Sequence, residues 1–419
     1  MSISAISKLA DDVNSFSGAL FMTESKYEIN QCTFINNPFS SFDVNNHITC
    51  GSFSSYTSSG ELKNCTFIDN YLINGNDAID AILFGGSASF LYSNATLLNC
   101  SYINSSIETK NPVNIIFGGA VSFLDSNINL ESWVFDNNTC NSTGNNNRGY
   151  GAAISFEDSN GTMNNCLINN NEIFVYSNEY DSRCFAGGFY AYRSDVHCFY
   201  SEFNDNYVFN QSPNSKSYVG AIVSIISTVD LDHCDFYSNK FFSHFTGDDT
   251  IFACGGSIYY ENSNGNLNSC RFFKSNSSTE LIDDDDDLFG YAIGGVINFL
   301  KSTNEINECL FINNSCSTIG TNSKSYGGGI NLPNSITTFS KCNFSINMVQ
   351  SFHTTSYNLG GAINTKDSNG TIIESIFDHN EVSGSWIQCF GCSLYISNSN
   401  FTISFCNFTE NNMNYNNNE

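Results

Sequence analysis

Residues 294–299, with the sequence GGVINF, and residues 306–314, with the sequence INECLFINN, contain the two motifs that decide the fold. The first motif is Gly-Gly-small-apolar-x-aromatic, and the second, about fifteen residues later, is apolar-x-x-Cys-x-Phe-x-x-Asn. Apolar positions alternate in both, as at Val121 and Phe123 and at Cys309 and Phe311, which indicates β-strands with one buried face. Each unit therefore reads as strand, turn, strand, loop.

Both motifs recur with a period of about 33 residues. The first begins at Gly85, Gly118, Gly151, Gly187, Gly255, Gly294, Gly327 and Gly360. The cysteine slot of the second falls at positions 32, 65, 100, 133, 166, 201, 234, 270, 309, 342, 375 and 406, of which Trp133, Ser201 and Ser375 do not hold Cys. Because nothing in the repeat has a helical period, ankyrin and tetratricopeptide repeats are excluded.

Such units bury their apolar faces only by stacking in parallel, about 4.8 Å apart. We therefore predict an all-β fold, a single right-handed parallel β-helix of about 12 coils with about 33 residues per coil. The repeats run from about residue 17 to 411 in one continuous domain, 1–419, which we expect to be a fragment of a longer protein. A leucine-rich repeat horseshoe is the alternative solenoid, since its Leu-x-x-Leu-x-Leu-x-x-Asn motif has the same spacing, but its units are shorter and contain one strand.

Stacking places equivalent residues of successive coils on top of one another, which predicts two ladders. The core ladder consists of Cys32, Cys65, Cys100, Cys166, Cys234, Cys270, Cys309, Cys342 and Cys406 with Phe34, Phe67, Phe135, Phe236, Phe311, Phe344, Phe377 and Phe408. The corner ladder consists of Asn37, Asn70, Asn138, Asn239, Asn314, Asn347, Asn380 and Asn411, because an Asn amide satisfies turn backbone groups and Asn tolerates left-handed φ. The paired glycines form another corner, through positive φ or close backbone approach.

The alternating Gly-Gly-Ala-Ile and Phe-x-x-Asn motifs resemble those of the chlamydial polymorphic outer membrane proteins and their protist look-alikes, in the pectate-lyase-like right-handed β-helix superfamily. The resemblance covers nearly the whole chain, from about Ser17 to Asn411. It implies an extracellular adhesive region, at the cell surface or secreted. The family's signal sequence, β-barrel and membrane anchor have no counterpart in these residues.

Charge and hydropathy narrow the range of functions further. The 419 residues include 15 Lys and Arg against 41 Asp and Glu, a net charge of -26, which excludes nucleic acid as a partner. No run of eighteen apolar residues occurs, and the first twenty residues lack the basic and apolar regions of a signal peptide.

Few residues suggest catalysis or metal binding. The four arginines, Arg148, Arg183, Arg193 and Arg271, fall in different coils, and no carboxylate pair recurs on adjacent coils. The run Asp283, Asp284, Asp285, Asp286 and Asp287 is a weak Ca²⁺ candidate and reads better as a solvated acidic loop. The pair Cys389 and Cys392 reads as core or corner cysteines, and the six histidines form no ligand pair. We expect no cofactor.

These observations favour a non-catalytic, adhesin-like module that binds a protein or glycan of a host or neighbouring cell. The loops after the Asn ladder, such as 139–150, 174–184 and 277–289, vary most and should carry specificity. A carbohydrate-active enzyme, of polysaccharide lyase or glycosidase type, and a purely structural spacer remain alternatives. Uncapped repeats at both ends suggest end-to-end self-association.

The cysteines are expected to be core residues rather than a disulfide framework, because a large core needs no covalent staples. Cys32, Cys65, Cys100, Cys309 and Cys342 are predicted to be buried thiols, since side chains in an in-register stack point the same way. Any disulfide should come from cysteines outside the slot, such as Cys50, Cys140, Cys184, Cys254 or Cys316.

Overall fold

The computed structural model describes residues 5–7, 14–16, 18–41, 47–74, 81–110, 112–177, 182–212, 216–245, 251–281, 290–320, 322–352, 356–384 and 388–415. Across these ranges the chain is a right-handed-type parallel β-solenoid of about 11 turns, with about 33 residues per turn and no helix. The predicted fold class is thereby confirmed. The chain divides into two compact units, Met1–Ser212 (unit 1) and Pro213–Glu419 (unit 2).

Each turn contains five short strands, not the two predicted. A turn of unit 1 consists of β11 (Tyr71–Asn74), β12 (Ile82–Phe84), β13 (Ala88–Leu91), β14 (Asn94–Leu98) and β15 (Ser101–Ile103). The corresponding turn of unit 2 consists of β46 (Ser315–Ile319), β47 (Lys324–Tyr326), β48 (Ile330–Pro333), β49 (Ile336–Ser340) and β50 (Asn343–Ser345). We name the sheets that these strands build A, B, C, D and E, in that order.

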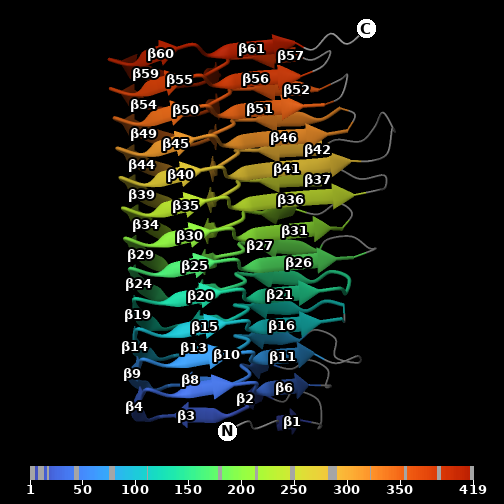
Figure 1. The fold of residues 1–419 in the computed structure, drawn as a ribbon, viewed down its shortest axis with the longest axis vertical. Coiled ribbons are helices and arrows are strands. Elements are labelled where there is room, and N and C mark those ends of the chain that lie inside the picture. Colours follow the sequence, from blue (N-terminus) through green and yellow to red (C-terminus); the bar gives the residue numbers. More distant parts are fainter. Residues whose placement is uncertain are drawn as a thin grey trace. The chain divides into compact units, whose positions relative to one another are not determined.

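Within each unit, every fifth strand pairs in parallel with its equivalent in the next turn. In sheet A of unit 2, β46 pairs with β51 (Met348–Ser351), and β51 pairs with β56 (Glu381–Gly384). Their register sets Cys316 beside Val349 and Val349 beside Val382. Figure 1 shows these strands one above another. Equivalent residues therefore stack, as the sequence repeat predicts.

Single residues with left-handed backbone separate the strands and explain why a motif read as one strand is divided. In the turn that contains β14 and β15, these residues are Gly85, Tyr92, Asn99 and Asn104, with φ of 60, 54, 50 and 52°. A residue in this region cannot continue a strand, so the chain turns there. Four corners per turn result, and the fifth connection is the segment between sheets A and B.

The glycine pair works as predicted. Gly294 has a φ of 65°, and a Cβ on Gly295 would lie 2.1 Å from the carbonyl oxygen of Gly328 in the next turn. The first glycine thus supplies the left-handed corner, and the second lets two turns approach closely.

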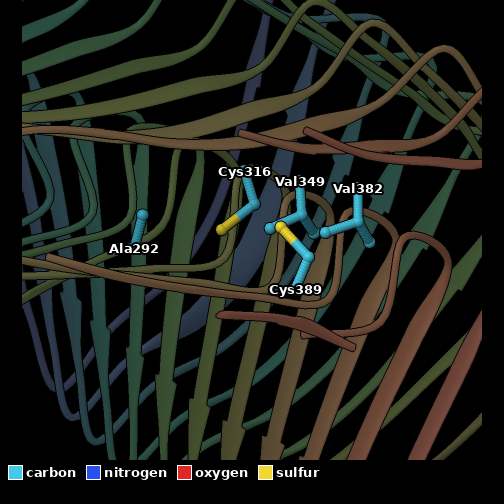
Figure 2. Packing of buried hydrophobic residues seen from close by; sticks show 5 residues of the cluster. All are labelled: Ala292, Cys316, Val349, Val382 and Cys389. Carbon is cyan, nitrogen blue, oxygen red and sulfur yellow. The ribbon is translucent and has the colours of Figure 1, made fainter. Parts of the chain in front are cut away.

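Aromatic and aliphatic side chains fill the interior. In unit 1 the rings of Phe34, Phe67 and Tyr102 stack with centroids 4.6 and 4.4 Å apart. In unit 2 the ladder runs through Phe236, Phe272, Phe311, Phe344, Phe377 and Phe408, with spacings of 4.7, 4.9, 4.6, 4.9 and 4.8 Å. Between sheets A and B, a second cluster packs Ala292, Cys316, Val349, Val382 and Cys389 together (Figure 2). Cys316, which we named as a disulfide candidate, is therefore a core thiol.

Variation in turn length is confined to the segment between sheets A and B. The strands of sheets C, D, E and A begin at Leu20, Lys26, Thr33 and Pro38 in one turn of unit 1, and at Phe53, Ser59, Thr66 and Tyr71 in the next, which are identical intervals. The connection from sheet A to sheet B, by contrast, varies in length. In unit 2 the shortest one comprises residues 385–387 and the longest comprises residues 282–289. These are the segments that the sequence marks as variable.

Candidate functional site

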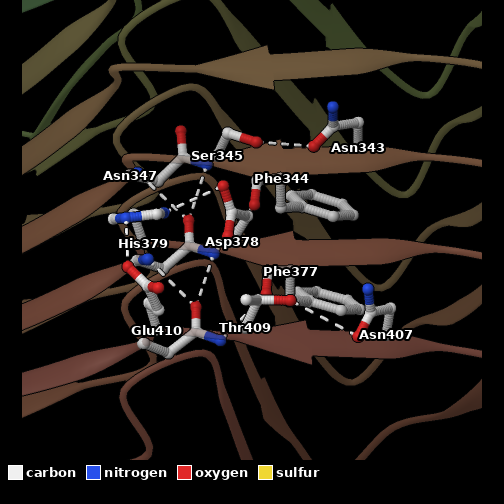
Figure 3. Close-up of polar contacts among 12 residues, drawn as sticks. Asn343, Phe344, Ser345, Asn347, Phe377, Asp378, His379, Asn407, Thr409 and Glu410 are labelled. Carbon is white, nitrogen blue, oxygen red and sulfur yellow. Dashed lines mark hydrogen bonds and ion pairs between the residues drawn. The ribbon is translucent and has the colours of Figure 1, made fainter.

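The corner asparagines form the predicted ladder, at the corner between sheets E and A. Asn347 Nδ2 donates to Asn380 Oδ1 (3.0 Å) and to the carbonyl of Phe311 (2.8 Å), and the Asn347 backbone N–H donates to Asn380 Oδ1 (3.0 Å). Figure 3 shows this corner. All but one of the predicted ladder asparagines are buried, namely Asn37, Asn70, Asn138, Asn239, Asn314, Asn347 and Asn380. Asn411 is partly exposed.

The ladder asparagine is not the residue with left-handed φ, as we expected it to be. That residue precedes it, as Ile346 (φ 58°) precedes Asn347 and His379 (φ 51°) precedes Asn380. The amide satisfies the backbone groups that the corner frees, and its neighbour makes the bend.

The cysteine slot is a corner position and not an ordinary core position. Cys309 Sγ donates to the carbonyl of Asn307 at 3.3 Å and to that of Leu267, in the preceding turn, at 3.4 Å. Ser375, in the same slot, donates to the carbonyl of Ile373 at 2.9 Å and accepts from the N–H of Cys342 at 3.1 Å. The slot thiols thus donate to the corner carbonyls as the Ser375 hydroxyl does, at longer donor–acceptor distances.

Most slot cysteines lie inside, and the structure records every cysteine of the chain as a thiol. The buried slot cysteines are Cys65, Cys100, Cys166, Cys234, Cys270, Cys309 and Cys342. The two partly exposed ones are Cys32 and Cys406. The expectation that Cys32 is buried is therefore wrong. Cys50, Cys140, Cys184, Cys254 and Cys316, which lie outside the slot, are also buried. Trp133 occupies the slot with its ring 5.0 Å from that of Tyr102.

A serine ladder at the corner between sheets C and D was missed. Ser335 Oγ donates to the carbonyl of Pro333 (3.0 Å) and to that of Phe299 in the preceding turn (2.9 Å), and it accepts from the N–H of Ser302 (3.2 Å). The signal was a serine with the same period as the two motifs, at positions 58, 93, 126, 159, 194, 227, 263, 302, 335, 368 and 399.

The other residues singled out in the sequence do not come together. Asp283, Asp284, Asp285, Asp286 and Asp287 lie outside the described residues. Within the described ranges, no three His, Cys, Asp or Glu side chains are arranged as metal ligands. Cys389 is a core thiol whose pKa burial raises to about 11, and Cys392 follows Gly391 (φ 67°) at the glycine corner.

Histidines make local ion pairs on the surface. His379 Nδ1 lies 2.9 Å from Asp378 Oδ2, and its Nε2 lies 2.7 Å from Glu410 Oε2 (Figure 3). The hydrogen bond and charge of Asp378 raise the pKa of His379, with a smaller contribution from Glu410. Half of the His379 side chain is exposed, so this pair stabilises only weakly.

A hollow with a largely apolar lining lies in unit 2, over the outer faces of sheets B and C, and we call it the B/C groove. Its volume is about 490 Å³. It is lined by Tyr218, Phe252, Cys254, Tyr259, Ile293, Asn298, Leu300, Tyr326, Asn331, Pro333, Leu359, Asn364, Lys366, Tyr395 and Ser397. These residues belong to strands β37 (Ile251–Cys254), β38 (Ile258–Glu261), β42 (Gly290–Ile293) and β43 (Ile297–Leu300), to β47 and β48, and to their neighbours.

Three asparagines run along the floor of this groove. Asn331 Nδ2 donates to Asn298 Oδ1 (2.7 Å), and Asn364 Nδ2 donates to Asn331 Oδ1 (2.6 Å). The register of sheet C places Tyr259 beside Asn298 and Tyr395 beside Asn364, so the row runs from tyrosine to tyrosine over five turns. In unit 1 the same position of sheet C holds Ser89, Ser122 and Ser155.

Comparisons with known proteins do not identify the chain. No family model, no curated protein and no solved structure matches it. The resemblance to the polymorphic outer membrane proteins therefore stays a prediction from the motifs. Within the described residues, we find no helix whose length and apolarity would suit a bilayer crossing.

Proposed function

We propose that this β-solenoid is a non-catalytic, adhesin-like binding module of a cell-surface or secreted protein. In this proposal the segments between sheets A and B contact a protein or glycan of a host or neighbouring cell. The observation that carries it is the confinement of length variation to one connection per turn, while four hydrogen-bonded corners keep their spacing. A rigid scaffold with one variable set of loops is the usual design of a binding protein.

A binding screen tests this proposal. The chain is immobilised and exposed to arrays of glycans and of surface proteins, together with a variant in which the long connection 282–289 is replaced by the short connection 385–387. We expect a partner whose binding this exchange weakens at least tenfold. The matched control is Asn266→Ala on the outer face of sheet D, which should leave binding unchanged. Absence of any partner, or polysaccharide turnover abolished by one carboxylate substitution, would contradict the proposal.

We also propose end-to-end self-association. In the last turn that the structure describes, Ile403 and Phe408 are 40 and 48 % exposed, whereas their partners in the preceding turn, Ile372 and Phe377, are buried. A second copy stacked on this turn would cover these side chains and pair with its strands. Sedimentation velocity at rising concentration should show larger species, and Phe408→Asp should reduce them. An unchanged monomer at high concentration would refute this.

A further inference from the structure

The B/C groove differs from the rest of the molecule in its polar groups. In a chain with a net charge of -26, the only ionisable side chains among its described lining residues are those of Lys366, Cys254 and four tyrosines, without a carboxylate. Lys366 is exposed, and its ammonium is a pure hydrogen-bond donor. The Tyr326 hydroxyl keeps its proton at neutral pH, as an ordinary tyrosine does, and burial raises its pKa further. The one charged group among these lining residues is therefore a donor, whereas the tyrosine hydroxyls both donate and accept.

The floor adds further donors. Each Asn side chain has two N–H groups, and Asn331 and Asn364 use one each in the row of amides. The second N–H of each amide remains for a ligand. These donors recur once per turn, about 4.8 Å apart.

The walls are aliphatic and aromatic. The aliphatic lining residues are Ile293, Leu300, Pro333 and Leu359.

 

A ligand that covers Lys366 and the remaining amide N–H groups without supplying acceptors would leave these donors unsatisfied, which is costly. Ring faces of Tyr326 and Tyr395 and the apolar wall residues instead suit flat, apolar groups. The groove thus fits a ligand that supplies acceptors at intervals and is apolar between them.

A proline-rich peptide has this chemistry. Proline has no backbone N–H, and in the polyproline II conformation the carbonyls make no internal hydrogen bonds. We propose that the B/C groove binds a proline-rich peptide segment in the polyproline II conformation, with its rings on the tyrosines and its carbonyls facing the floor asparagines, Lys366 and the Tyr326 hydroxyl. This inference rests on the proposed function, since both treat the chain as a binding module.

The dimensions of the groove agree with this ligand. The floor of the groove extends from Tyr259 to Tyr395 across four successive strand pairings, a length of about 19 Å at about 4.8 Å per pairing. Six residues of polyproline II, at about 3.1 Å each, cover the same length. One three-residue turn of that helix, about 9.3 Å, matches two steps of the solenoid, so its carbonyls can meet equivalent donors repeatedly. Aromatic-lined grooves are a recurrent way of binding such segments.

The test is a titration of the full chain against a fluorescein-labelled proline decamer, read by fluorescence polarisation. A Gly-Ser decamer and maltoheptaose, a neutral oligosaccharide, serve as competing probes. We expect saturable binding of the proline decamer that neither competitor displaces. Tyr326→Phe, which removes one hydroxyl donor, should weaken binding about fivefold, as expected for the loss of one hydrogen bond.

Further variants separate the groove from the loops. Leu300→Trp should fill the groove and abolish binding of the decamer, while Tyr357→Phe, on sheet B but outside the lining residues, should leave it unchanged. Circular dichroism verifies that each variant keeps its β-structure. Equal affinity of wild type and Tyr326→Phe, no binding of the decamer, or its displacement by maltoheptaose would overturn the inference. A partner that still depends on connection 282–289 would then leave the proposed function intact.

Discussion

Removing one side-chain amide from the corner ladder should destabilise unit 2 far more than the small size of that side chain suggests. In Asn380→Ala, the backbone N–H of Asn347 loses its acceptor (3.0 Å), and the carbonyl of Phe344 loses its 2.8 Å donor. The side-chain bonds to Asn347 and Asn411 disappear as well. An orphaned buried N–H costs about 1–3 kcal/mol and each lost hydrogen bond about 1 kcal/mol, so we expect a loss of about 3 kcal/mol.

Urea unfolding followed by far-UV circular dichroism measures this loss, and Asn343→Ala is the matched control. Asn343 lies on the neighbouring strand and accepts only from Ser345 in the same strand (Figure 3), so its loss should stay below about 0.5 kcal/mol. A loss below about 1 kcal/mol for Asn380→Ala would refute the reasoning, because the amide would then not be satisfying buried backbone.

Natural replacements in the ladder suggest a rescue. Where the ladder holds Ser105 or Ser275, its hydroxyl bonds that of Ser87 (2.6 Å) or Ser257 (2.7 Å) in the glycine motif of the same turn. Ala362 occupies the glycine-motif position that corresponds to Asn380. We therefore expect Ala362→Ser to recover about 1 kcal/mol of the stability that Asn380→Ser loses. If the double variant is no more stable than the single one, the two positions are not coupled.

Three further predictions concern titratable side chains and thiols. Cys309→Ser should change the free energy of unfolding by less than about 1 kcal/mol, because Ser375 makes the equivalent hydrogen bond in its own turn. Cys309→Ala, which removes the donor, should cost about 1–2 kcal/mol. Equal costs for the two variants in urea unfolding would exclude the hydroxyl-like role of Cys309. An NMR titration should give His379 a pKa above its ordinary value, and Asp378→Asn should lower that pKa. Because the pKa is raised in the folded state, the small stabilisation by the His379 ion pairs is complete below about pH 6.5 and is lost as the pH rises through the folded-state pKa. Cys140, whose pKa burial raises to about 12, should resist iodoacetamide until unfolding, while partly exposed Cys392 reacts; native labelling of Cys140 would contradict its burial.

The fold was predictable because stacking repeats the same residues in the same places. The spacing of Phe311 and Phe344 fixes both the period and the face that is buried, and the two rings lie 4.6 Å apart as the repeat requires. The glycine and asparagine corners followed from the same argument, since few residue types fit a tight bend.

The five-strand turn and the role of the cysteines were not predictable from alternation alone. Cys309 and Phe311 alternate like strand residues, yet Cys309 sits in a corner after Glu308, whose φ is 54°. Left-handed backbone at Glu308 or Ile346 leaves no mark in the sequence, because neither residue type prefers it. The serine ladder was hidden by the high serine content, which makes each serine unremarkable until its period is counted.

The B/C groove could not be predicted, because it depends on a difference between turns. Repeat analysis emphasises what turns share, whereas Asn298, Asn331 and Asn364 stand where unit 1 has serines. Larger side chains at this outward position raise the floor and place Tyr259 and Tyr395 at its two ends. A binding site on a solenoid should accordingly be sought where successive turns depart from the repeat on an outward-facing position, because the inward positions are constrained by stacking and the corners by their hydrogen bonds.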